Sequence, residues 1–363
     1  MESITMAEQG KSVRITRAAA KKRAAATMPV ELQLFSKRVV LGELTNVADV
    51  DVLVNRTPVF ESPGCNSESE VDEPVETQEI CAEADPPQMC SPYASDIYQY
   101  LRNMEVDPMR RPLPDYMEKI QKDVNANMRG VLVDWLVEVA EVYNLLSDTL
   151  HLSISYIDRF LSVIALNRKS LQLLGVSSML IASKYEEISP PEVKDFCNIT
   201  EYTYSNDEII KMEAEILKTL KFEMGNPTIQ TFLRKFTGVA LQFYKVPNLQ
   251  LEFLCYYLAD LSLLDYKFVR FLPSLVAASV VLLAVFLIQP KMDPWCPILQ
   301  ECSGYKASDL KECVLAIHDL YLGRRGGSLH AIREKYNRDK FKSVATMPSP
   351  PEIPISCFGE IKG

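Results

Sequence analysis

The sequence predicts an all-α protein, and three observations support this fold class. From Asn127 to about Lys342, apolar segments with helical periodicity follow one another, with short breaks such as NRKS, ISPPEV and MGNPT between them. No run alternates apolar and polar residues as a half-buried strand does. Hydrophobic residues make up 47% of the 363 residues, so the chain has enough apolar material for a substantial core.

Residues 1–92 differ in composition from the rest and are predicted to form a disordered leader. They begin with Ala, Lys and Arg and continue with Pro, Glu, Ser and Asp, with few aromatic residues. The first thirty residues lack the apolar stretch of a secretory signal. The nine cysteines include no Cys-x-x-Cys pair, which favours reduced thiols in an intracellular compartment.

The first helix is expected in DIYQYLRNME, where Ile97, Tyr100, Leu101 and Met104 follow helical spacing and form one apolar stripe. The proline-interrupted stretch MRRPLPDYM connects this amphipathic helix to the helical region. The segment MRGVLVDWLVEVAEVY at 128–143 is apolar on two faces, which is typical of a core helix surrounded by its bundle.

Two apolar segments of the helical region resemble each other. LQLLGVSSMLIAS at 171–183 is similar to FLPSLVAASVVLL at 271–283, and each lies late in a group of about five helical segments. The similarity suggests two bundles of about 100 residues each. Residues 271–288 are uncharged over about the minimum length of a membrane-spanning helix. Their Ala and Ser content and internal position favour a buried helix over the alternative, a single-span membrane protein.

Charge and missing motifs argue against several function classes. The net charge of −9 makes the folded part a poor candidate for nonspecific nucleic-acid binding. His151, His318 and His330 are too few and too separated for a metal or triad site, and we expect surface or partly buried helical positions for them. No metal or cofactor is predicted. A Gly-rich phosphate loop, a His-Arg-Asp loop and Asp-Phe-Gly are all missing, so the chain is predicted to be non-catalytic.

Four long motifs in order resemble the cyclin box of A- and B-type cyclins: MRGVLVDWLVEV, LHLSISYIDRFL, LIASKYEEISPPEV and KMEAEILKTLKFEM. The second-box segments YKFVRFLPSLVAAS and HAIREKY follow, and the resemblance runs from about residue 94 to 355. LVDWLVEV, KFEM and the C-terminal half resemble A-type more than B-type cyclins, and the Ala/Lys/Arg leader resembles that of a plant A-type subgroup. A B-type cyclin is the nearest alternative. The resemblance implies two tandem five-helix cyclin-box bundles, at 93–226 and 227–345, and a C-terminal tail at 346–363. It departs at Gly130, where the usual Ala is replaced by a residue that costs a helix up to about 1 kcal/mol.

By this resemblance the chain binds and activates a cyclin-dependent Ser/Thr kinase. The Lys and Glu that contact the kinase in cyclins match Lys184 and Glu213, and Tyr185, Glu186, Glu187 and Phe222 lie alongside. Two opposite charges suit an interface because each can bind a partner group while fixing orientation. Both residues could instead be solvated charges on a helix surface. A helical adaptor in transcription, built on the same double-box fold, is an alternative function.

The resemblance also assigns a structural pair and a docking patch. Arg129 and Asp158 match a pair that ties the first helix of the box to the second. An apolar patch with a carboxylate at its rim would hold the Leu and Arg of Arg-x-Leu motifs in substrates or inhibitors. Part of this patch, Leu132 above all, is also expected to be core. The matching residues are Met128, Val131, Leu132, Trp135, Glu138, Leu171 and Gln172.

The leader contains a short motif in KRVVLGELTN. Arg38, Leu41 and Asn46 resemble the destruction box that the anaphase-promoting ubiquitin ligase reads. A ligase must bind such a motif as an extended peptide, so its place in a disordered leader fits this interpretation.

The leader also contains a basic cluster, which includes Lys21, Lys22 and Arg23. The cluster predicts nuclear import, with the cytoplasm as a second compartment, whereas a helix packed on the body is the alternative. Three dipeptides are minimal sites for a proline-directed kinase: Thr57-Pro58, Ser62-Pro63 and Ser91-Pro92.

Overall fold

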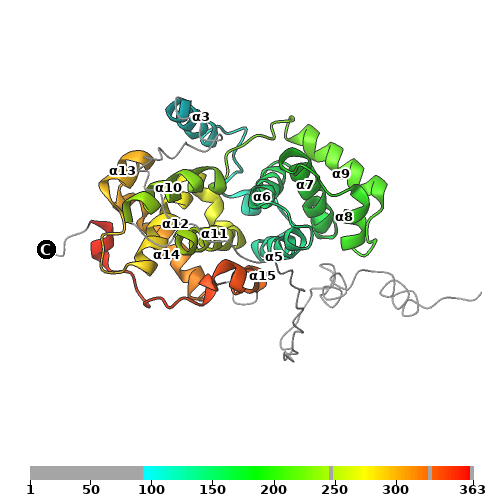
Figure 1. The fold of residues 1–363 in the computed structure, drawn as a ribbon. Coiled ribbons are helices and arrows are strands. Elements are labelled where there is room, and N and C mark those ends of the chain that lie inside the picture. Colours follow the sequence, from blue (N-terminus) through cyan, green and yellow to red (C-terminus); the bar gives the residue numbers. More distant parts are fainter. Residues whose placement is uncertain (1–92, 245–247, 326–328, 360–363) are drawn as a thin grey trace, which may run out of the picture.

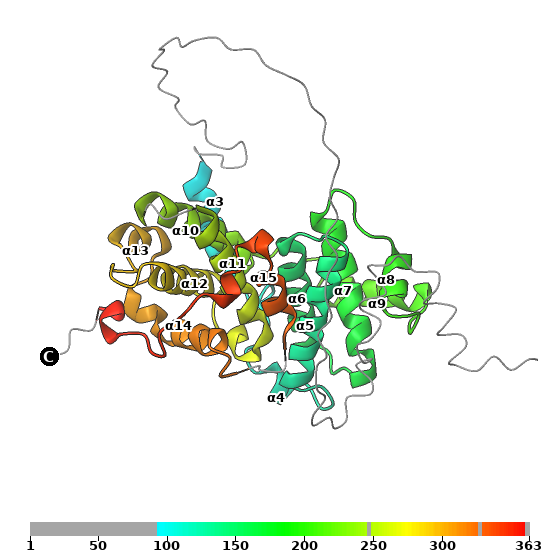
Figure 2. The same ribbon diagram turned by 60° about the horizontal axis from the view of Figure 1, so that its bottom comes forward.

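The computed structural model describes residues 93–244, 248–325 and 329–359, and this part of the chain contains helices and no strand. Figures 1 and 2 show two groups of helices side by side, with α3 against the second group. The all-α fold with two five-helix bundles is confirmed. The leader, with its predicted basic cluster and destruction box, lies outside the described residues.

The first bundle consists of α5 (Ala126–Val142), α6 (Ser147–Leu161), α7 (Leu171–Glu186), α8 (Val193–Ile199) and α9 (Asn206–Thr219). The second consists of α10 (Ile229–Tyr244), α11 (Asn248–Leu264), α12 (Pro273–Ile288), α13 (Pro297–Ser303) and α14 (Ala307–Tyr321). Around them lie α3 (Ala94–Glu105), α4 (Tyr116–Lys119) and α15 (Ala331–Tyr336). Short 3-10 turns complete the fold: η3 (Arg168–Ser170), η4 (Tyr266–Arg270), η5 (Asp339–Phe341), η6 (Val344–Thr346) and η7 (Ile355–Phe358).

The two similar apolar segments form α7 and α12, each the third helix of its bundle rather than a late one. Both are buried along almost their whole length, because small residues let neighbouring helices approach. At Gly175 in α7, an added Cβ would lie 2.8 Å from Cδ1 of Leu132 in α5, too close to be tolerated unmoved. Within the described residues, no helix has the length and apolar character needed to cross a membrane.

The start of α12 explains how α3 is attached to the second bundle. Pro273 occupies the first turn of α12, and no side chain at its own N-cap satisfies the free backbone N–H groups. The buried carboxylate of Glu105, at the end of α3, accepts hydrogen bonds from the Ser274 backbone N (2.9 Å) and Oγ (2.7 Å). Glu105 also pairs with Arg102 at 2.8 Å. Glu105 of α3 therefore caps the N-terminus of α12, which has no capping side chain of its own.

The face of α3 that packs is not the predicted apolar stripe. Ile97 and Tyr100 of that stripe are 46% and 61% exposed. Instead Tyr98 is half-buried, with its ring edge-on to Phe232 at 6.1 Å, and Glu105 is buried. The helix exists and is amphipathic as predicted, but the polar anchor at its end rotates the predicted stripe partly outward.

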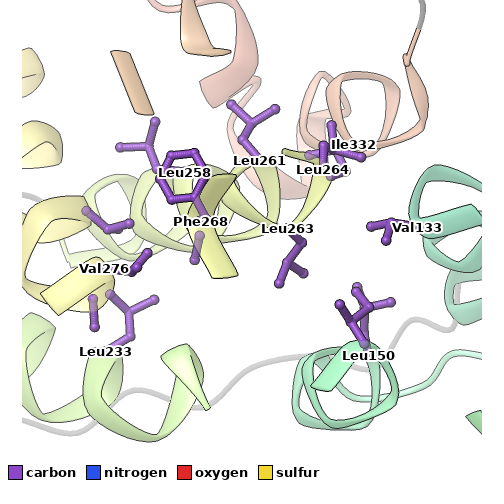
Figure 3. Close-up of a cluster of buried hydrophobic side chains, with 14 of the residues drawn as sticks. Val133, Leu150, Leu233, Leu258, Leu261, Leu263, Leu264, Phe268, Val276 and Ile332 are labelled. Atoms are coloured by element: carbon purple, nitrogen blue, oxygen red, sulfur yellow. The ribbon is translucent and has the colours of Figure 1, made fainter. Parts of the chain in front are cut away.

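Apolar side chains join the two bundles. In Figure 3, Val133 of α5 and Leu150 of α6 face Leu263 at the end of α11, all of them buried. At Gly130 on α5, an added Cβ would lie 3.2 Å from the carbonyl oxygen of Leu264. The glycine that departs from the cyclin motif therefore stands where α5 passes close to the α11 backbone.

A buried charged cluster lies at the same junction. Asp260 of α11 is fully buried and accepts hydrogen bonds from Lys335 Nζ (3.0 Å) and Tyr336 Oη (2.9 Å) of α15. His151 Nε2 of α6 lies 3.1 Å from its other oxygen. Burial raises the pKa of Asp260, but Lys335 and His151 outweigh this effect and lower it to about 2. The cluster therefore links α6, α11 and α15 by charge.

The expectation for two of the three histidines was wrong. His151 and His318 are 3% and 2% exposed and hence fully buried, whereas His330 is exposed and precedes α15. Sequence spacing did not show that polar partners from other helices, such as Asp260, would make this burial tolerable.

Candidate functional site

An ion pair joins α7 to α9 on the outer face of the first bundle. Lys184 Nζ, in the last turn of α7, lies 2.6 Å from Glu213 Oε1 of α9. The two side chains are 48% and 14% exposed. Because the Lys184 side chain is about half exposed, the pair contributes modestly to folding, and its charges can be shared with a partner at small cost.

Large apolar side chains stand exposed around this pair. Tyr185 is 56% exposed, Ile188 is fully exposed and Phe222 is 68% exposed. An added Cβ at Gly225 would lie 2.7 Å from the Tyr185 hydroxyl, so the Tyr185 ring extends to the chain that follows Phe222. Clustered exposed apolar residues beside charges are typical of a surface that binds another protein.

A groove runs beside the pair, between α7, the loop before α8, and α9. Lys184 and Ile210 line it together with Pro190, Pro191 and Val193. Ile188 and Ile210 were not among the predicted site residues. The signal was available in sequence: an isoleucine in the polar break ISPPEV, and a second one on a largely charged helix.

The backbone around Phe222 is strained. Lys221 and Phe222 have φ values of 54° and 59°, the left-handed region that non-glycine residues avoid. Such a conformation costs about 1–3 kcal/mol per residue and persists where the surrounding structure enforces it, often at binding sites. Here the Phe222 N–H donates to the Leu217 carbonyl at 2.9 Å, and the Phe222 ring is presented to solvent.

Two of the predicted residues are engaged inside the bundle. The Glu187 carboxylate accepts hydrogen bonds from the Leu146 backbone N (2.8 Å) and from Thr149 Oγ1 (2.5 Å), at the start of α6. Glu187 therefore caps α6, which has no cap of its own. Glu186 is half-buried, and its pKa is raised by that burial and by the nearby Asp148 carboxylate. A kinase contact by either residue stays a prediction.

Arg129 and Asp158 form a buried, bidentate ion pair. Arg129 Nε donates to Asp158 Oδ1 at 2.6 Å and Nη2 donates to Oδ2 at 2.7 Å. The third guanidinium nitrogen, Nη1, donates to the Leu263 carbonyl of α11 at 2.7 Å. Tyr116 Oη of α4 donates to Asp158 Oδ1 at 2.8 Å. One pair thus links α5 and α6 to α4 and to the second bundle.

The predicted docking patch divides into a surface part and a core part. Met128, Val131, Trp135 and Glu138 are half-buried and follow one stripe of α5. Leu132 is fully buried against Gly175, as the sequence had suggested. Leu171 and Gln172, at the start of α7, are buried as well. The accessible patch therefore consists of three apolar side chains with a carboxylate at one end.

Comparisons with known proteins match this architecture. The family described as "Cyclin, N-terminal domain" matches residues 96–225, and "Cyclin, C-terminal domain" matches residues 227–350. The chain belongs to the cyclin family.

Relatives place this cyclin among the plant A-type cyclins. It is 55% identical to Cyclin-A3-2 of Arabidopsis thaliana, over 98% of this chain and all of the relative. It is 53% identical to Cyclin-A3-1 of Oryza sativa subsp. japonica, over 96% of both chains. It is also 55% identical to the G2/mitotic-specific cyclin C13-1 of Daucus carota, over 90% of this chain and 96% of the relative. The two Cyclin-A3 names favour the A-type assignment over the B-type alternative.

A solved structure shares the fold of this cyclin. A viral cyclin from herpesvirus saimiri aligns with a TM-score of 0.53 at 21% identity, over 63% of this chain and 96% of the viral chain. Cyclins are regulatory proteins rather than enzymes, so the non-catalytic assignment follows from family membership.

Proposed function

We propose that this cyclin is the regulatory subunit that binds and activates a cyclin-dependent Ser/Thr protein kinase. The observation that carries the proposal is the Lys184–Glu213 pair, set among exposed Tyr185, Ile188 and Phe222 on one face of the first bundle. The charges would orient the kinase, and the apolar side chains would supply the buried area of the interface.

The mechanism is a shift in the conformational equilibrium of the kinase. A protein kinase is active when a strand Lys pairs with a Glu on a mobile helix and the activation loop is ordered. A surface that binds only the active position of that helix raises its population. The α7–α9 face suits this task because the inner sides of both helices are packed in the core, which keeps the outer face rigid.

A double substitution tests the proposal. Lys184→Ala with Glu213→Ala should abolish activation of the kinase, measured as histone phosphorylation, while the melting temperature of the cyclin stays near the wild-type value. The matched control is Arg270→Ala with Glu312→Ala, which removes an exposed ion pair from the second bundle. Undiminished histone phosphorylation with the first variant would refute the assignment of this face.

We also propose that the α5 stripe docks Arg-x-Leu segments of substrates or inhibitors. Met128, Val131 and Trp135 give an apolar surface for the Leu, and Glu138 gives a carboxylate for the Arg. The supporting observation is that these four side chains reach the surface of a helix whose other faces are buried.

Two proposals concern the leader. Arg38, Leu41 and Asn46 would be read as a destruction box, so Arg38→Ala with Leu41→Ala should lengthen the life of the protein through mitosis. An unchanged degradation rate of this variant would show that the motif is not a destruction box. Lys21, Lys22 and Arg23 would belong to a nuclear-import signal, and a deletion of the cluster that leaves the protein nuclear would count against it.

A further inference from the structure

The chain after α15 crosses the surface of α14, held at two points by its backbone. Tyr321 Oη donates to the Met347 carbonyl at 2.6 Å. Arg324 Nη2, just beyond the end of α14, donates to the Pro351 carbonyl at 2.6 Å. The short stretch 347–351 between these anchors is irregular and contains three prolines. Proline-rich chain of this kind is extended and has no regular backbone hydrogen bonding.

A third contact lies between the two anchors and involves a side chain of the tail. His318 Nε2, on the same face of α14, is 2.8 Å from Ser349 Oγ. The imidazole is buried, whereas Ser349 is half-buried between exposed Pro348 and Pro350. The serine hydroxyl therefore lies where an exposed extended segment meets a buried titratable group.

The sequence around this serine fits a known type of enzyme substrate. Ser349 is followed by Pro350, the minimal recognition dipeptide of proline-directed kinases. Ser349 lies on the surface of the folded body. Because 347–351 belongs to no helix and lies outside both bundles, this segment can open locally without unfolding them, which gives a kinase access to the hydroxyl.

A titratable side chain, His318, lies next to Ser349, and a positive one, Arg324, binds its segment. Burial and the positive charge of Arg324 lower the pKa of His318, whereas its bond to the Pro350 carbonyl and the Asp319 carboxylate act in the opposite direction. Asp319 itself is paired with Arg324 at 3.1 Å and with Arg325 at 3.6 Å. A phosphoryl dianion on Ser349 would lie next to the His318 imidazole, whose protonation it would favour, and near the Arg324 guanidinium.

We propose that Ser349 is a phosphorylation site for a proline-directed Ser/Thr kinase, and that His318 and Arg324 bind the phosphoryl group and hold the tail against α14. In the transfer step, Ser349 Oγ attacks the γ-phosphorus of ATP. The new O–P bond forms as the bond to ADP breaks, and the hydroxyl proton passes to the catalytic base of the kinase. The proposal goes beyond kinase activation, because it assigns a covalent modification to the cyclin itself.

The first test asks whether the site is modified. The full chain is incubated with Mg-ATP and an independently active proline-directed kinase, together with a Ser-Pro reporter peptide, and phosphorylated residues are mapped by mass spectrometry. We expect phosphate on Ser349, its loss in Ser349→Ala, and its retention in Ser356→Ala, a control serine of the exposed tail that no proline follows. A phosphorylated reporter with no phosphate on Ser349 would overturn the proposal.

The second test asks where the phosphoryl group binds. Protection of the tail is measured by amide hydrogen exchange and limited proteolysis before and after phosphorylation. We expect both to slow several-fold at 347–358, and Arg324→Ala to remove this gain while leaving phosphorylation possible. The phosphate resonance of Ser349 should also titrate at lower pH than a leader phosphoserine. Faster cleavage after phosphorylation, or an Arg324→Ala variant with the full gain, would show that these side chains do not bind the phosphate.

Discussion

Removing the carboxylate of Asp158 should destabilise this cyclin more than any substitution of a surface charge. In Asp158→Ala, Arg129 loses two of its three hydrogen-bonding contacts and Tyr116 loses its acceptor. Burial lowers the pKa of Arg129, but Asp158 outweighs burial and raises it above the ordinary value. The guanidinium is 2% exposed and stays charged, so the variant keeps a buried charge without its counter-ion.

The expected magnitude follows from that uncompensated charge. Breaking a buried pair by removing one partner costs about 3–5 kcal/mol of unfolding free energy. With a denaturant dependence of about 3 kcal/mol per molar urea, this loss lowers the urea midpoint by about 1 M or more. Replacing both partners, as Arg129→Met with Asp158→Leu, should cost less than Asp158→Ala, because no charge is then left unpaired.

Urea unfolding followed by circular dichroism measures these midpoints. The control is Asp123→Ala, which removes an ion pair with Arg168 on the surface and should change the midpoint little. If Asp158→Ala also leaves the midpoint nearly unchanged, or if the double variant is the less stable one, the assignment of the pair as a stabilising link would be refuted.

Three further predictions concern packing, pH and docking. Gly130→Ala should lower the urea midpoint although alanine favours the helix, because the added Cβ would lie 3.2 Å from an α11 carbonyl oxygen. Gly238→Ala has open space around the added Cβ and should raise the free energy of unfolding by about 0.5–1 kcal/mol. Equal gains at both glycines would contradict the close approach of the bundles. The pKa of Asp260 is lowered from its ordinary value of 3.8 to about 2, so its ionised form stabilises the fold at pH values above 3.8. This contribution is lost as the pH falls toward about 2. The difference in unfolding free energy between wild type and Asp260→Asn should therefore shrink below about pH 4. A gap that stays constant from pH 7 to pH 3 in urea titrations would argue against that linkage. Met128→Ala with Trp135→Ala should slow phosphorylation of Arg-x-Leu substrates and spare short peptides without the motif, whereas equal losses for both would count against a docking patch.

The fold could be predicted from sequence because its signals are local. Helical periodicity and short breaks marked the helices, and the small residues of 171–183 and 271–283 marked the most deeply packed ones. The buried place of Leu132 also followed from the two-sided apolar pattern of α5. These features depend on neighbours a few residues apart, which a single sequence displays directly.

The features that sequence did not show depend on contacts between distant residues. The outward turn of Ile97 and Tyr100 follows from Glu105 capping a helix about 170 positions away. Likewise, the burial of His151 depends on Asp260 of the other bundle. Periodicity identifies an apolar face, but a polar anchor from elsewhere in the fold can rotate that face away from the core.

The residues proposed for the candidate site from sequence include both its ion pair and two of its exposed apolar side chains, Tyr185 and Phe222. Lys184 and Glu213 were found through a family motif, and the structure brings them within 2.6 Å of each other. Ile188 and Ile210 were missed, although the sequence shows one isoleucine in a polar break and the other on a largely charged helix. Glu187, by contrast, was predicted to bind the kinase together with its charged neighbours, but in the fold its carboxylate caps α6.

Titrating the purified cyclin into a purified monomeric cyclin-dependent kinase tests the central claim most directly. Complex formation is followed by size-exclusion chromatography and activity by histone phosphorylation in the same samples. We predict that the two proteins co-elute and that activity rises from near zero to a plateau at one cyclin per kinase. Separate elution, or co-elution without any rise in histone phosphorylation, would contradict the proposal that this surface activates a kinase.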